Sequence, residues 1–409
     1  MIGFYSARIA VPHTADMTFD EHCRDSVLAL RGALLDLYRE AGADVDKPQD
    51  VARRYKLNKN LTWKIARIIQ TEDAYTAVPL IPGASGFEIL LDAMHNAGAP
   101  ANVVARVRAA AEGFDRMIEI HTGDRATLEL ALDSMGGERP LEMSRKLAFR
   151  GNSGVWGIQS HVRVTTQFLA PNTDNTNILD AALIGGMTRV RRLRHVSRWP
   201  VFQLRQYNDD GTIPNLPEPI SIEEHDESGP WLMKSYCSGA MPRMHIQKGE
   251  QGLTYEIGEG PVGRTGEFTC FFGYSQRQIA PRYRDEHNRV AELFSTVSIP
   301  AETLLFDLIV HRDLVEAMRP EIELHGKLWG AGVDGLPASR LPCSDQVIDL
   351  GVGAQLATPL VPSYAEMVRK VMDNVGWNPS DFRCLRLIML YPPMPSTVVM
   401  RYPLPENQD

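Results

Sequence analysis

The segment PQDVARRYKLNKNLTWKIARII, residues 48–69, is the most informative stretch of the chain for its fold. Pro48 opens the short segment QDVARRYK, and NLTWKIARII follows it closely. The small Ala52 would let a second helix approach the first, and Leu57 supplies an apolar residue between them. The spacing therefore predicts two short helices joined by a tight turn.

The second of these helices has two distinct faces. Leu61, Ile65 and Ile68 recur at helical spacing and predict an inner, apolar face. On or near the outer face and the N-terminal end we place Lys59, Asn60, Thr62, Trp63, Lys64 and Arg67. Asparagine can bond adenine through two hydrogen bonds, and lysine can reach guanine or phosphate oxygens, so this face suits contact with DNA.

The charge of this segment opposes that of the whole protein. The chain of 409 residues has a formal net charge of −8, whereas residues 47–70 contain seven basic residues and a single acid, Asp50. A local charge of +6 would attract the phosphate backbone of a nucleic acid. Any such contact must be local, because the chain as a whole is acidic.

The segment DVARRYKLNKNLTWKIARII resembles the helix-turn-helix of bacterial transcriptional regulators, over about 22 residues. The glycine usual in the turn is absent: Tyr55 or Lys56 stands near its place, and Asn58 tolerates the left-handed geometry that such a turn wants. The resemblance implies binding to double-stranded DNA. The expected DNA-binding residues are Arg53, Arg54, Lys56, Asn58, Lys59, Asn60, Thr62, Trp63, Lys64 and Arg67.

A second basic run lies in the sequence TRVRRLRHVSRWPVF. It contains Arg189, Arg191, Arg192, Arg194 and Arg198. These arginines form a candidate second basic surface for a nucleic acid or another ligand. An exposed strand or helix face with acidic partners would give the same pattern.

The sequence predicts an α+β protein with two domains. Helical periodicity runs through the first part, and Thr18 with Glu21, Ser85 with Glu88, and Ser363 with Glu366 have the spacing of a capping box. Gly136, Gly137 and Pro140 end the helical region, which places a helical domain at 1–138 and a larger, strand-rich domain at 139–409.

Within the second domain, short segments rich in β-branched and aromatic residues predict strands. Residues 150–161 are expected to form a helix-to-strand junction, or else a polar pocket around Asn152 and Gln159. Helical patterns are expected to return at 281–297 and 301–318, and STVVMRYPLP is expected to form an edge strand, because Pro403 and Pro405 close it.

Several classes of protein are disfavoured by composition. The five cysteines are scattered and form no CxxC pair, which argues against disulfide frameworks and zinc fingers. The N-terminal residues lack the pattern of a secretory signal, and no long apolar run predicts a membrane span, so we expect a cytoplasmic protein. Gly258, Gly260 and Gly263 spell GxGxxG, but a strand-like segment follows, which favours a hairpin loop over a nucleotide site.

These observations favour a DNA-binding transcriptional regulator. The expected partners are double-stranded DNA, a second copy of the chain in a homodimer or higher homo-oligomer, and a small-molecule effector of the second domain. We assign no catalytic residue, no metal ligand and no cofactor. Two alternatives stay open: a self-associating scaffold protein with a nucleic-acid-binding helical domain, and an enzyme whose site lies within 150–400.

Overall fold

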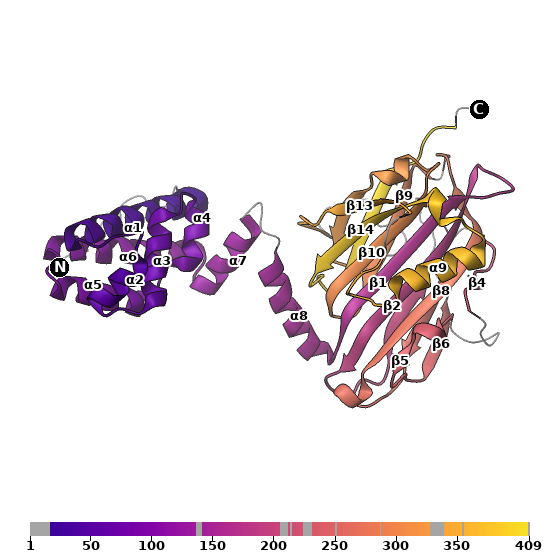
Figure 1. Ribbon diagram of the computed structural model, residues 1–409, viewed down its shortest axis with the longest axis horizontal. Coiled ribbons are helices and arrows are strands. Elements are labelled where there is room, and N and C mark those ends of the chain that lie inside the picture. The colour runs from indigo at the N-terminus through magenta and orange to yellow at the C-terminus, as the bar shows by residue number, and fades with distance from the viewer. Residues whose placement is uncertain are drawn as a thin grey trace, which may run out of the picture. The chain divides into compact units, whose positions relative to one another are not determined.

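The fold is that of an α+β protein, seen in a computed structural model (Figure 1). The structure describes residues 17–135, 141–204, 212, 215–223, 231–249, 252–286, 288–327, 339–353 and 356–407. The chain divides into two compact units, residues 1–139 and 140–409. The domain boundary expected between residues 138 and 139, and the end of the first helical region at Gly136–Pro140, lie outside the described residues.

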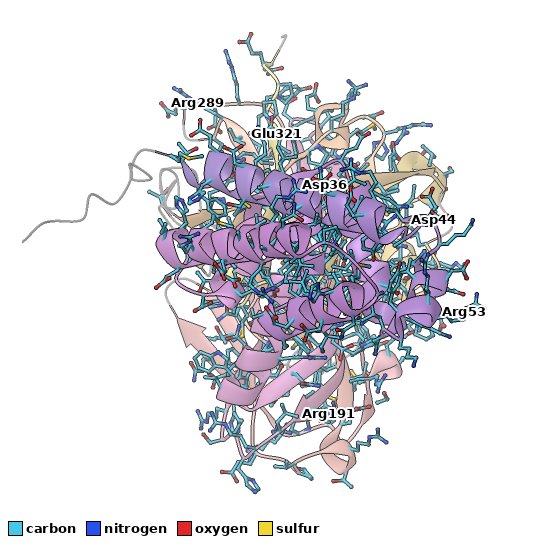
Figure 2. All side chains as sticks on the ribbon, turned by 90° about the vertical axis from the view of Figure 1, so that its left-hand side faces the viewer. Asp36, Asp44, Arg53, Arg191, Arg289 and Glu321 are labelled. Atoms are coloured by element: carbon cyan, nitrogen blue, oxygen red, sulfur yellow. The ribbon has the colours of Figure 1, made fainter. Side chains whose placement is uncertain are left out.

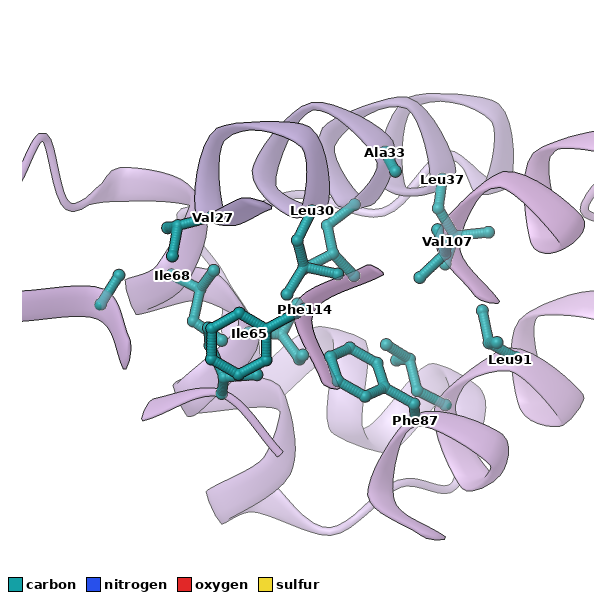
Figure 3. Close-up of a cluster of buried hydrophobic side chains, with 14 of the residues drawn as sticks. Val27, Leu30, Ala33, Leu37, Ile65, Ile68, Phe87, Leu91, Val107 and Phe114 are labelled. Atoms are coloured by element: carbon teal, nitrogen blue, oxygen red, sulfur yellow. The ribbon is translucent and has the colours of Figure 1, made fainter. Parts of the chain in front are cut away.

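The first unit consists of helices around one apolar core. These helices are α1 (Phe19–Ala41), α2 (Pro48–Tyr55), α3 (Lys59–Gln70), α4 (Ala74–Ala77), the 3-10 helix η1 (Val78–Leu80), α5 (Ala84–Asn96), α6 (Ala101–His121) and α7 (Arg125–Met135). Figure 3 shows Val27 and Leu30 of α1 close to Ile65 of α3 and Phe114 of α6. This core fixes α3 against the two longest helices of the unit.

The helix ends follow the sequence in part. Thr18 and Glu21 form the expected capping box at the start of α1. The other two expected boxes are wrong: α5 begins after Gly83 with no side-chain cap, and Ser363 makes no capping hydrogen bond to α9 (Tyr364–Val375). No single helix among the described residues is long and apolar enough to cross a membrane.

The second unit begins with α8 (Glu142–Trp156), a helix that the sequence pattern did not predict. Gly157 ends it in the left-handed conformation, and β1 starts at the next residue, so the helix-to-strand junction expected at residues 150–161 is confirmed. The buried pair Arg145–Asp345 (Nη1–Oδ2 2.7 Å) ties α8 to the chain before β13.

Strands make up most of the second unit. They are β1 (Ile158–Pro171), β2 (Ile178–Arg192), β3 (Trp199–Leu204), β4 (Ile220–Ser221), β5 (Ser238–Gly239), β6 (Met244–Gly249), β7 (Gly252–Ile257), β8 (Phe268–Pro281), β9 (Val290–Val297), β10 (Ala301–His311), β11 (Glu321–His325), β12 (Arg340–Leu341), β13 (Val347–Val352), β14 (Phe382–Leu390) and β15 (Ser396–Pro403).

Among the described residues, the largest sheet has eight strands in the order β13-β14-β10-β1-β2-β8-β4, with β5 also paired to β8. Its centre is a parallel pair, β1 with β10, flanked by antiparallel neighbours. Helix α9 lies across one face (Figure 1). The other face packs against two smaller sheets, β12-β11-β15-β9 and β3-β7-β6.

Three expectations about the second unit are wrong. Residues 281–297 and 301–318 contain the strands β9 and β10 rather than long helices. Strand β15 lies between β11 and β9, so STVVMRYPLP is an inner strand of its sheet. The GxGxxG loop is not a hairpin, because it joins β7 of the three-stranded sheet to β8 of the large sheet.

Candidate nucleic-acid interface

Helices α2 and α3 are joined by a turn of three residues. Lys56 adopts the left-handed conformation (φ 54°, ψ 38°), and its N–H donates to the carbonyl of Ala52. Leu57 is buried, and the side chain of Asn58 accepts a hydrogen bond from the backbone N–H of Asn60 at 2.8 Å. The turn thus reverses the chain at Lys56 and starts the next helix at Asn58.

The two helices pack through the residues that the sequence pattern places inside. Val51 and Ala52 are buried on α2, and Ile65 and Ile68 are fully buried on α3. Figure 3 shows Ile65 and Ile68 turned towards α1. Leu61 is half-buried and packs at the edge of the same core. The opposite face of α3 is therefore the one that solvent reaches.

That outer face carries a stripe of four residues, Asn60, Trp63, Lys64 and Arg67. They follow one another at spacings of three and four residues, which puts them on one side of the helix. Asn60 and Arg67 are exposed, Lys64 is half-buried, and Trp63 keeps 47% of its surface in contact with solvent. A large aromatic side chain left this open, among polar and basic neighbours, suits a contact surface rather than a core. We call these four residues the α3 stripe.

Thr62 does not belong to this surface, and its predicted place on the outer face is wrong. Its side chain is fully buried, and its Oγ1 donates to the carbonyl of Lys59 at 3.1 Å. The position lies three residues before Ile65 and four before Ala66, so helical spacing turns it inward. Thr62 thus supports α3 from inside and has no access to a DNA groove.

The basic residues of α2 are exposed but partly engaged. Arg53 projects from the surface (Figure 2), with 77% of its side chain exposed and Asp50 as its ion-pair partner. Such a surface pair is weak, so Arg53 stays available to a phosphate. Arg54 instead donates from Nη1 to the carbonyl of Gly42 at 2.8 Å and lies over the Tyr55 ring. The Arg54 side chain therefore links α2 to Gly42, the residue that ends α1.

Lys56, Asn58 and Lys59 are exposed and lie beside the N-terminus of α3. The first N–H groups of a helix and nearby lysines together attract phosphate oxygens. Two acids lie in the loop before α2: Asp44 pairs with Lys47 at 3.2 Å, and Asp46 accepts from Gln70 at 2.9 Å. A backbone hydrogen bond from Asp46 and the side chain of Lys47 lower the pKa of Asp44, which keeps its carboxylate charged at neutral pH.

The second basic run does not form one surface. Arg192 is buried, so its predicted place on a basic surface is wrong: its Nη2 donates to the carbonyl of Gly258 at 2.5 Å. Arg189 and Arg198 are exposed and pair with Glu267 and Glu256 at 3.3 and 3.9 Å. Arg194 donates to the carbonyl of Val155 at 2.5 Å, and Arg191 is half-buried. Four of these five arginines thus have partners within their own unit.

Two polar clusters of the second unit were not found from the sequence. Asp307, Arg386 and Tyr364 form a buried network between the large sheet and α9. His325 lies between Ser339 (Nδ1–Oγ 3.1 Å) and Glu323 (Nε2–Oε2 3.1 Å). The first cluster joins residues of three separate elements, and the second brings Ser339, 14 positions further along the chain, to His325 and its near neighbour Glu323. No local motif of the sequence marks either cluster. The second combines a hydroxyl, an imidazole and a carboxylate, which keeps the enzyme alternative open.

No family model matches this chain, and no curated protein is similar to it. Its functional assignment therefore depends on the geometry of the α3 stripe and its surroundings.

Proposed function

We propose that this protein is a transcriptional regulator that binds double-stranded DNA with α3 in the major groove. The observation that carries the proposal is the α3 stripe on the second helix of a pair joined by a three-residue turn. A helix fits the major groove of B-DNA, and its exposed side chains then face the base edges.

Each group of the surface has a role in this proposal. Asn60 offers an amide that can pair with adenine, and Lys64 and Arg67 offer donors for guanine or for phosphate. Trp63 supplies an apolar face for a thymine methyl group. Lys56, Lys59 and Arg53 flank the stripe and would hold the phosphate backbone.

Regulators that read DNA in this way commonly act as dimers on inverted half-sites. We therefore propose that two copies of the chain bind together in the cytoplasm. The enriched DNA would then contain two inverted half-sites whose centres lie about 10 base pairs, or a multiple of this, apart.

Selection from a pool of random duplexes tests the proposal. The wild-type protein should enrich a defined motif and bind it at least about a thousandfold more tightly than unrelated DNA at physiological salt. The double variant Asn60→Ala/Lys64→Ala should lose most of this discrimination, because a good base contact contributes about 1–3 kcal/mol.

A matched control separates base reading from charge. Asn96 and Arg116 are exposed on α5 and α6, and the double variant Asn96→Ala/Arg116→Ala removes the same kinds of group away from the stripe. It should enrich the wild-type motif. Lys59→Ala should weaken binding to all sequences alike and make the dependence of log K on log salt shallower by about one. If the wild-type protein enriches no motif, the proposal fails.

A further inference from the structure

The second unit contains a cavity of about 240 Å³. It lies on the face of the large sheet away from α9, between β1, β2 and β8 on one side and β3, β9 and β15 on the other. Alternate residues of β1 point to opposite faces, so Val162 and Val164 reach the α9 side while Arg163, Thr165 and Gln167 line the cavity.

Arg163 is the one cationic side chain among the described residues that line the cavity, and the one acid there, Glu292, is paired with Arg401. The residue is 6% exposed, and its Nη1 donates to the carbonyl of Val201 at 3.1 Å. Its Nε is buried without a hydrogen-bond partner, and among the described residues no carboxylate forms an ion pair with it. Burial lowers the pKa of Arg163 to about 10, which leaves the guanidinium charged at neutral pH.

Other buried arginines of the same unit show how this charge is usually balanced. Arg145 pairs with Asp345, and Arg386 pairs with Asp307, each at 2.7 Å. Arg192 has no acid either, but its guanidinium fills the space over Gly260, where an added Cβ would come within 2.6 Å of Nη1. Arg163 differs from all three because it borders open space large enough for a ligand.

The cavity changes in character along β1. Near Arg163 lie the hydroxyls of Thr165 and Ser295, which bond each other at 2.7 Å. Beside these hydroxyls the lining becomes apolar: Phe202 lies over Gly185, which is opposite Thr165, and Leu183 is opposite Gln167. The far end, about 20 Å from Arg163 at the usual rise, is lined by Leu169, Leu179, Leu204, Tyr402 and Leu404 together with Glu292.

The size of the cavity limits what it could hold. Its volume exceeds that of the roughly 150 Å³ cavities that bind benzene, and falls short of most sites for drug-sized ligands. A ligand of about ten non-hydrogen atoms would fill it. One buried cation favours one negative charge, and Leu183 and Phe202 favour an apolar body beside it.

We propose that this cavity binds a small monocarboxylic acid, with its carboxylate on Arg163 and its aromatic or aliphatic body beside Leu183 and Phe202, between β2 and β3. The planar guanidinium matches a carboxylate through two parallel hydrogen bonds. This proposal does not depend on DNA binding, since it concerns a separate unit and is tested without DNA.

Calorimetric titration of the full chain with matched probes tests the proposal. Benzoate and hexanoate should each bind saturably, whereas benzamide and hexanamide, which keep the shape but lack the charge, should bind at least tenfold more weakly. Acetate, which has the charge without the body, should also bind at least tenfold more weakly than benzoate. Absence of saturable binding for both acids, or equal binding of acid and amide, would overturn the proposal.

Three variants locate the site. Arg163→Met should abolish the preference for acid over amide, while Arg264→Met, at an exposed arginine of the same unit, should leave it unchanged. Arg163→Met should also unfold at a urea concentration no lower than the wild-type protein, because it removes a charge that lacks an acid.

Leu183→Trp keeps Arg163 but fills the cavity near it from β2, so it should weaken acid and amide binding alike by tenfold or more. This variant keeps the test decisive if Arg163→Met does not fold. Wild-type affinity for benzoate in folded Arg163→Met or Leu183→Trp protein would overturn the proposal.

Discussion

Lys56 shows how one residue can replace the glycine expected in a helix-turn-helix. The sequence pattern places Lys56 or Tyr55 near the usual glycine position and suggests that Asn58 absorbs the left-handed geometry. Instead, Lys56 itself is left-handed, while Asn58 has an extended backbone and caps α3. A non-glycine residue in this conformation costs about 1–2 kcal/mol.

Two substitutions of Lys56, to glycine and to valine, should therefore change the free energy of unfolding in opposite directions. Lys56→Gly should raise the free energy of unfolding by up to about 1 kcal/mol, since relief of strain outweighs the added freedom of the unfolded chain. Lys56→Val should lower it, because a β-branched side chain tolerates this conformation poorly. Urea unfolding measures both, and a Gly variant less stable than the Val variant would contradict the explanation.

Asp307 is the centre of the buried network on the α9 side of the large sheet. Its carboxylate accepts from Nε and Nη2 of Arg386 at 3.0 and 2.7 Å, and from the hydroxyl of Tyr364 at 2.7 Å. Burial and the adjacent Asp307 carboxylate raise the pKa of Tyr364 well above its usual value, so the phenol stays a donor. The network joins β10, β14 and α9.

Loss of the negative charge of Asp307 should destabilise the second unit strongly. Asp307→Asn should lower its free energy of unfolding by about 3–5 kcal/mol, because Arg386 then stays buried without an acid. The double variant Asp307→Leu/Arg386→Met should recover most of that loss, since it removes both charges. Urea unfolding of the full chain compares them; equal losses in the single and double variants would argue against this account.

At the scale of elements, the hydrophobic pattern predicted the helical unit and several strands of the large sheet, but it failed at the central strand β10. Strand β10 buries Leu305 and Ile309 towards α9, and Leu304, Phe306 and Leu308 towards the four-stranded sheet. A strand covered on both faces is apolar at successive positions, so it loses the alternation that marks a strand and resembles a helix. Helix α3 has one face towards solvent, and its pattern is therefore clear.

The same reasoning explains what could be predicted of the candidate sites. The α3 stripe comes from eight consecutive residues of one helix, so helical spacing alone predicts it. The prediction for Thr62 was wrong because this residue lies three positions before the buried Ile65 and therefore on the same inner face. Arg192 was misplaced because β2 turns alternate residues inward. The cavity is lined by residues of six strands that are spread over more than two hundred positions of the chain, and no local sequence pattern predicts that they come together.

Helices α1 and α6 are linked by a pair of histidines, and protonation of one of them, His22, should affect the stability of the helical unit. Nδ1 of His22 and Nε2 of His121 lie 3.0 Å apart. Burial lowers the pKa of His22, and His121 lowers it further, against the opposing effect of Asp25. The folded state thus holds the proton less tightly than the unfolded state does.

The stability that His22 contributes is complete above its unfolded pKa of about 6.5 and is lost as the pH falls below it. The urea midpoint of the helical signal, followed by circular dichroism at 222 nm, should therefore drop between pH 7 and pH 5. His22→Gln should reduce this drop, whereas His95→Gln, in the same unit, should preserve it. An equal drop in the wild-type and His22→Gln proteins would exclude this role for His22.

At the scale of the whole molecule, the two units have separate cores. The helical core is made by buried residues from Cys23 to Leu132, and the clusters of the second unit begin at Ile158. A unit of this size with its own core is expected to fold by itself. The proposed DNA binding and the proposed ligand binding can then be measured separately.

A fragment of residues 1–139 should therefore be folded. It should give a helical circular dichroism spectrum and unfold cooperatively in urea. It should also bind the motif that the full chain enriches, with the same sequence preference, because the α3 stripe lies wholly within it. A fragment without cooperative unfolding would mean that the second unit is needed to stabilise the first.

The parallel pairing of β1 with β10 has a consequence for the order of events during synthesis. Ser160 lies opposite Ala301, so the central contact of the large sheet joins residues about 140 positions apart and cannot form until β10 has been made. Contacts this distant fold slowly, whereas the contacts of a small helical unit are local and fold fast. We expect the helical unit to be complete on the ribosome while the strands of the second unit still lack their partners. The nascent chain would acquire the surface proposed to contact DNA well before the cavity proposed to bind a ligand closes.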